Sequence, residues 1–104
     1  MAGRIAVPID RERIRALCEK YHIRRLSFFG SVLRDDFSEN SDVDVLVEFE
    51  PGHTPGFFTL FDIEAELSDN FDGRKVDVRT PEDLSRYFRR QVVDTMVTGY
   101  EAGR

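Results

Sequence analysis

Apolar side chains recur along this chain with two different spacings, one typical of helices and the other typical of strands. Over residues 10–21 they return every three or four positions, which predicts a helix with one buried face, and Asp10 suits its N-cap. The same spacing predicts a helix over residues 57–69. A third helix is predicted to begin at Thr80, a capping residue followed by proline and two acidic residues, and we expect residues 93–100 to be helical too.

Strict alternation of apolar and polar positions predicts the strands. It is clearest over residues 42–50, where three valines and a phenylalanine share one face. Residues 75–79 repeat the pattern, and residues 26–29 form a short apolar run that stops at Gly30, as a buried strand does. Strands that alternate with helices predict an α/β fold, with a small mixed β-sheet flanked by helices.

A chain of 104 residues with 40% hydrophobic positions is expected to form one domain, spanning residues 1–104. A single cysteine, Cys18, excludes an internal disulfide, and two histidines are too few for a structural metal cage. Neither a membrane-spanning run nor a secretory signal is apparent, so we expect a cytoplasmic protein. A core of this size is modest, and association with a partner or a second copy would stabilise it.

The net charge of −5 conceals an uneven distribution of charged residues. Residues 35–72 contain twelve acidic residues and no lysine or arginine, whereas the segments before and after them are net positive. This acidity argues against direct DNA binding as the main function. Either the acidic residues form a solvated surface, or some of them gather around a divalent cation, and their spacing must decide between the two.

Three aspartates are placed to form such a cluster. Asp42 and Asp44 are two positions apart on one predicted strand, so their side chains leave the same face with Cα atoms roughly 6.5–7 Å apart. Asp77 points away from the apolar face of another predicted strand in the same way. If the two strands are neighbours, three carboxylates converge, and a hard cation such as Mg²⁺ would offset their repulsion. Such a site clamps substrate phosphates, and the third carboxylate could activate an attacking hydroxyl.

Gly30 and Ser31 lie at a predicted strand-to-helix junction, a place where phosphates are often bound. A glycine permits close approach of the backbone, and a helix start offers free N–H groups beside the serine hydroxyl. Taken alone, the pair indicates only a tight turn. It gains weight because Ser31 precedes Asp42 by eleven residues and because the loop between them contains Arg34, a candidate phosphate clamp.

Together these motifs resemble the signature of the minimal nucleotidyltransferases, small members of the polymerase-beta-like superfamily. The resemblance rests on Gly-Ser-Val-Leu-Arg at residues 30–34, six loop residues, Ser-Asp-Val-Asp-Val-Leu-Val at residues 41–47, and Asp77, and it covers nearly the whole chain. It implies the nucleotidyltransferase fold, with ATP as the nucleotide donor and Mg²⁺ as the cofactor.

The resemblance also implies a role for each motif residue. Gly30 and Ser31 would hold the nucleotide phosphates, and Arg34 matches an arginine that often follows this pair. Asp42, Asp44 and Asp77 would bind the metal and form the catalytic set, with Asp77 as the third catalytic carboxylate. Many relatives have glycine where this chain has Asp35, which leaves the local shape of the loop open.

Stand-alone domains of this type resemble the antitoxin of toxin–antitoxin pairs. In such pairs the toxin is an all-helical HEPN-domain RNase, and the antitoxin transfers AMP from ATP onto a toxin tyrosine. Two alternatives stay open: an antitoxin that neutralises its partner by binding alone, and a nucleotidyltransferase that acts on a small antibiotic-type hydroxyl compound.

Two further groups of residues have open roles. Lys75 and Arg79 share the face of Asp77, where they either neutralise the carboxylates or contact the triphosphate. Apolar residues near the C-terminus are expected to form a patch that the toxin or a second copy covers, although the last of them could belong to the core; they are Tyr87, Phe88, Val92, Met96 and Tyr100.

Overall fold

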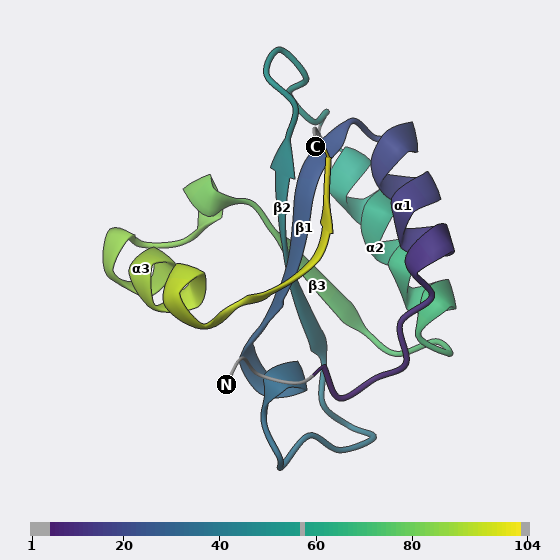
Figure 1. Ribbon diagram of the computed structural model, residues 1–104, viewed down its shortest axis with the longest axis vertical. Coiled ribbons are helices and arrows are strands. Elements are labelled where there is room, and N and C mark those ends of the chain that lie inside the picture. Colours follow the sequence, from purple (N-terminus) through teal and green to yellow (C-terminus); the bar gives the residue numbers. More distant parts are fainter. Residues whose placement is uncertain (1–4, 57, 103–104) are drawn as a thin grey trace.

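The computed structural model describes residues 5–56 and 58–102, which form a four-stranded sheet with helices on both faces (Figure 1). The strands are β1 (Ile23–Phe29), β2 (Val43–Phe49), β3 (Val76–Arg79) and β4 (Val97–Glu101), in the spatial order β3-β2-β1-β4. β1 pairs antiparallel with β2 and β4, whereas β2 and β3 are parallel. The sheet is therefore mixed, and the predicted fold class is confirmed.

Two helices, α1 (Arg11–Lys20) and α2 (Thr59–Asn70), cover one face of the sheet (Figure 1). Asp10 caps α1 as predicted, because its carboxylate accepts a hydrogen bond from the backbone N–H of Arg13 at 3.2 Å. The predicted second helix agrees with α2, except that Phe57 lies outside the described residues. The main core fills the space beneath these helices and includes Ile14, Leu17, Phe28, Val43, Val45, Val47, Ile63 and Leu67.

The third helix, α3 (Arg86–Thr95), lies on the opposite face of the sheet (Figure 1). The prediction that it starts at Thr80 is wrong. Thr80 and the acidic residues after it form only a short 3₁₀ turn, η2 (Pro81–Asp83), and α3 begins after Ser85, whose side chain accepts from the N–H of Phe88. A second, smaller core lies under α3 and consists of Phe29, Leu46, Leu84 and Val92. It explains why Leu46 is apolar although it lies on the same face of β2 as the aspartates.

The predicted helix over residues 93–100 is correct only as far as Thr95, where α3 ends, and is wrong beyond it, because residues 97–101 form β4. Valine, threonine and glycine are poor helix formers, and β1 has a free edge that a strand can satisfy with backbone hydrogen bonds. Gly99 packs directly against the ring of Phe28: a Cβ added there would lie 2.6 Å from a ring carbon. The tail therefore completes the sheet at one edge.

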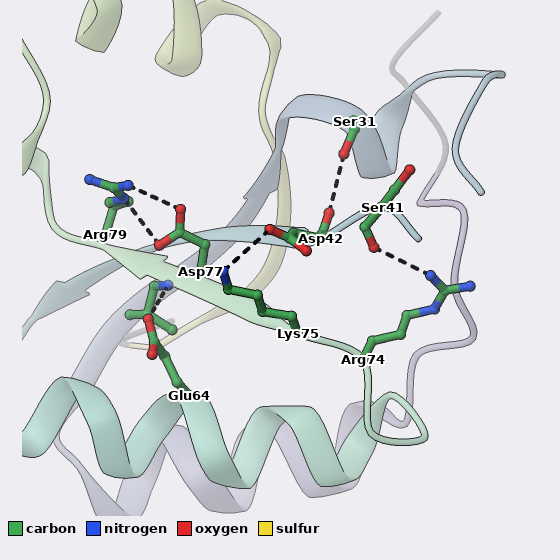
Figure 2. A network of polar contacts seen from close by, with 9 residues as sticks. Ser31, Ser41, Asp42, Glu64, Arg74, Lys75, Asp77 and Arg79 are labelled. Carbon is green, nitrogen blue, oxygen red and sulfur yellow. Dashed lines mark hydrogen bonds and ion pairs between the residues drawn. The ribbon is translucent and has the colours of Figure 1, made fainter. Parts of the chain in front are cut away.

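The other edge of the sheet is covered from α2. The carboxylate of Glu64 accepts a hydrogen bond from the backbone N–H of Val78 at 2.9 Å, so β3 is not open there to pairing with another strand (Figure 2). Within the described ranges, every helix is too short or too polar to cross a membrane.

Candidate active site

The pairing of β2 with β3 places three aspartates on one face of the sheet. Asp44 lies opposite Asp77 in the parallel register, and Asp42 precedes Asp44 by two positions on the same strand. Val43 and Val45 are buried in the main core on the other face, so the alternation of β2 directs both aspartates away from α1 and α2. The structure therefore brings together the carboxylates that the sequence singled out.

Gly30 lies directly against one of these carboxylates. Its φ is +76°, in the left-handed region that favours glycine, and a Cβ added there would lie 2.5 Å from Oδ2 of Asp44. Gly30 begins a 3₁₀ turn, η1 (Gly30–Leu33), and the Ser31 hydroxyl donates to the backbone carbonyl of Asp42 at 3.1 Å. The Gly-Ser turn is thus held against the start of β2, at the side of the aspartates.

Two basic side chains of β3 and its approach face the aspartates (Figure 2). The guanidinium of Arg79 donates to both oxygens of Asp77, at 3.2 and 3.1 Å, and the Lys75 ammonium lies 4.0 Å from Oδ2 of Asp42. These contacts place both basic side chains beside the carboxylates, and a contact with the triphosphate stays a prediction. Among the described residues, no three acidic, histidine or cysteine side chains are gathered closely enough to ligate one ion.

Asp44 is the carboxylate of the three that has no such cationic partner within the described ranges. Burial raises its pKa, and the neighbouring charges of Asp77 and Asp42 raise that pKa further, against smaller opposing effects of Arg79 and Arg34. Three carboxylates with one of them uncompensated are a donor set suited to a hard divalent cation. The type of the donor groups therefore fits Mg²⁺, but for all three carboxylates to bind one ion their side chains would have to turn towards one point and Arg79 would have to release Asp77.

Arg34 does not reach the aspartates. It is largely exposed, and its Nε donates to the side chain of Asp36 at 3.2 Å. It directly follows η1, the turn that begins at Gly30. Its proposed role as a phosphate clamp stays a prediction.

Sequence reasoning missed Arg74, which fixes the loop between the Gly-Ser turn and β2. Its guanidinium donates to the carbonyl oxygens of Ser38, Glu39 and Ser41 at 2.9, 3.3 and 3.4 Å, and it lies over the ring of Phe37. Figure 2 shows the contact with Ser41. Only its position just before β3 could have pointed to this role, because its partners are backbone atoms that leave no pattern in a sequence.

The fold and the site define a class of protein, and comparison with known families agrees. The family model of the nucleotidyltransferase domain matches residues 11–98, from the start of α1 into β4. The chain therefore belongs to the nucleotidyltransferase domain family. The resemblance to minimal nucleotidyltransferases seen in the sequence is confirmed.

The chain is also similar to individual proteins of known sequence or structure. A protein of Methanocaldococcus jannaschii assigned as a protein adenylyltransferase is 41% identical over 70 residues, which are 67% of this chain and 68% of that protein. A solved structure assigned as a minimal nucleotidyltransferase is 32% identical, with a TM-score of 0.68 over 84% of this chain and 86% of that one. A crystal structure of a toxin–antitoxin with AMP-PNP has a TM-score of 0.72 at 20% identity, over 90% of this chain and 75% of that one, and shares the fold.

Proposed function

We propose that this chain is the antitoxin of a toxin–antitoxin pair and that it transfers AMP from ATP to a tyrosine hydroxyl of a HEPN-family RNase toxin. The observation that carries the proposal is the carboxylate of Asp44, set between Asp42 and Asp77 and pressed against Gly30. Support comes from the M. jannaschii relative, assigned as a protein adenylyltransferase, and from the toxin–antitoxin structure that contains an ATP analogue.

Asp42, Asp44 and Asp77 are the residues that would hold Mg²⁺. When bound, the ion supplies positive charge that offsets the charge of the triphosphate. The Gly-Ser turn approaches the phosphates with backbone N–H groups, and a serine hydroxyl is available there when it leaves the Asp42 carbonyl. Arg79, released from Asp77, is then free to pair with phosphate oxygens, since a guanidinium binds either anion through the same pair of donors.

The transfer step forms one bond and breaks another at the α phosphorus, and a residue of the chain takes up the proton. The acceptor oxygen forms a bond to the α phosphorus, the bond from that phosphorus to the bridging oxygen breaks, and pyrophosphate leaves. The hydroxyl proton passes to the carboxylate of Asp77, which Arg79 has left to pair with the phosphates. The reaction belongs in the cytoplasm, where ATP is supplied and the buried Cys18 stays reduced.

The mass of the partner tests this proposal. The chain is mixed with ATP, Mg²⁺ and the all-helical RNase that the neighbouring reading frame is expected to encode, and the intact mass of the RNase is measured. A gain of one or more adenylyl groups on a tyrosine is the expected result. Tight binding without any gain would show neutralisation by occlusion, and transfer to a small hydroxyl compound without the RNase would show a different acceptor.

Two variants serve as controls in the same assay. Asp44→Asn removes a carboxylate charge at nearly constant volume and should abolish the mass gain. Asp62→Asn makes the same chemical change on the exposed surface of α2, away from the site, and should leave the gain unchanged.

A further inference from the structure

A cavity of about 450 Å³ adjoins the aspartates on the side of β1, between the sheet and α3. Gly30 and Asp44 both contribute to its wall, so it is continuous with the candidate active site. Asp44 pairs with Phe29 of β1 on one side and with Asp77 of β3 on the other. The cavity and Asp77 therefore flank Asp44 from opposite sides, and a ligand in the cavity can extend to Asp44 without displacing a group that approaches from Asp77.

The deeper wall of the cavity is aromatic and apolar. Phe29 and Val92 are buried, and Phe88 of α3 keeps 45% of its surface exposed. The rings of Phe29 and Phe88 meet edge to face, with centroids 6.4 Å apart. An exposed ring in a cavity of this volume offers a flat surface on which a planar group can stack.

The outer wall is polar and carries groups that can recognise a ring edge. Gln91 and Asp94 lie three positions apart on α3, on the side that faces the cavity. Neither side chain makes a hydrogen bond or an ion pair with another residue in the part of the chain that the structure describes. An amide and a carboxylate side by side provide donors and acceptors for a heterocycle, and the carboxylate specifically accepts from an amino group.

The charge of the cavity indicates which part of a nucleotide it can take. Asp44 and Asp94 line it, and none of its lining residues is a lysine or an arginine. Apart from the backbone of the Gly30 turn, the lining offers a triphosphate no positive group, whereas the basic side chains Lys75 and Arg79 lie on the β3 side of Asp44. The uncharged end of the nucleotide is the part that fits.

We propose that this cavity, here named the α3 cavity, binds the nucleobase of the donor nucleotide. Phe88 stacks on the base, and Asp94 accepts a hydrogen bond from an exocyclic amino group, which favours ATP over ITP. The inference rests on the proposed function and deepens it by assigning base selectivity to α3. The ring of an acceptor tyrosine is the competing occupant, but its hydroxyl must meet Asp77, on the far side of Asp44.

Equilibrium binding of α,β-methylene-ATP with Mg²⁺ to the full chain tests the stacking role without a partner protein, because this analogue cannot be cleaved between its α and β phosphates. Phe88→Leu should weaken binding about tenfold, as expected for the loss of one base–aromatic stack. Tyr87→Leu is the matched control, since Tyr87 is 77% exposed on the same helix and does not line the cavity. Its affinity should equal that of the wild type.

Competition between ATP and ITP tests the role of Asp94, because ITP carries a carbonyl where ATP carries the amino group. The wild type should prefer ATP by about tenfold, the loss expected when a hydrogen bond to a charged group is replaced by an unpaired acceptor. Asp94→Asn should bring the ratio close to one, whereas Asp62→Asn should leave it unchanged. Asp94 is exposed, so its replacement leaves the fold intact even where Phe88→Leu lowers stability.

Unchanged nucleotide affinity in Phe88→Leu, or an unchanged ATP-to-ITP ratio in Asp94→Asn, would overturn this inference. So would a result in which Phe88→Leu raises the KM for the acceptor protein while nucleotide binding stays as in the wild type. The proposed function fails on different results: transfer that survives in Asp44→Asn, or nucleotide binding with normal base selectivity in a chain that never transfers AMP.

Discussion

Replacing Asp44 with asparagine should make the protein more stable while it removes the activity. The pKa of Asp44 is raised in the folded state, first by burial and then by the charges of Asp77 and Asp42. A raised pKa in the folded state means that folding disfavours the ionised carboxylate. The destabilisation that results is absent at low pH, where the group is protonated in both states, and it grows as the pH rises above the ordinary carboxylate pKa. Asparagine has nearly the same volume and carries no charge, so it avoids this penalty.

The size of the effect follows from the spacing of the strands. Neighbouring strands lie about 4.8 Å apart, and two like charges at about 5 Å repel each other by roughly 1–3 kcal/mol for dielectric constants between 80 and 20. Arg79 offsets part of this repulsion through its attraction to Asp44. We therefore expect Asp44→Asn to gain about 1 kcal/mol, which corresponds to a rise in Tm of roughly 4–8 °C for a domain of this size.

Scanning calorimetry at pH 7 measures this gain, first with EDTA and then with Mg²⁺ and α,β-methylene-ATP. With EDTA the variant should melt above the wild type, and the nucleotide and metal should raise the Tm of the wild type alone. Asp62→Asn should melt within a degree or two of the wild type in both buffers. A variant that melts below the wild type with EDTA would refute the electrostatic reasoning, because the charge would then be stabilising the fold.

Four other outcomes are expected. Gly30→Ala places a Cβ 2.5 Å from Asp44 in a left-handed backbone, so it should cost about 1–2 kcal/mol in urea denaturation and abolish transfer; wild-type behaviour would show that the turn can shift freely. Arg74→Gln should increase amide hydrogen exchange in residues 34–41, and Arg74→Lys should restore part of the protection. Hydrogen bonds from Tyr21 and Lys20 lower the pKa of Glu66. The stability that the ionised Glu66 contributes is therefore present above the ordinary pKa of 4.5 and is lost as the pH falls below that value. Glu66→Gln should flatten the acid limb of a curve of stability against pH, and a limb identical to that of the wild type would contradict this. Burial raises the pKa of Cys18 to about 12, so a disulfide reagent at pH 8 should label it only after unfolding, and rapid labelling of the folded chain would show that the site opens.

Local patterns in the sequence were sufficient to predict the strands that carry the aspartates. Strict alternation in β2 fixed which side chains share a face, and a helical stripe with Asp10 as its cap fixed α1. Side-chain period is a property of the backbone itself, so it can be read without knowing the fold. That Asp77 lies beside Asp44 needed one further condition, that β2 and β3 are neighbours, which the structure supplies.

The parts that the sequence did not predict depend on contacts between distant segments. The 97–101 segment is a strand because the edge of β1, some seventy residues earlier, needs backbone partners. Thr80 and the three residues after it are typical of a helix start, but the chain turns there to reach the other face of the sheet. The α-helix therefore begins later, after Ser85. Leu46, apolar on an acidic face, was the one local sign that α3 would cover part of that face.

The pairing of Asp77 with Arg79 determines how fast Arg79 can move from the carboxylate to a bound phosphate. The two residues are two positions apart on β3, so exchanging the guanidinium from carboxylate to phosphate needs rotation about side-chain bonds and no displacement of the backbone. Rotations of exposed side chains take picoseconds to nanoseconds, many orders of magnitude faster than lid closures. We expect arrival of the nucleotide to be limited by diffusion and desolvation, with the sheet acting as a rigid template throughout the catalytic cycle.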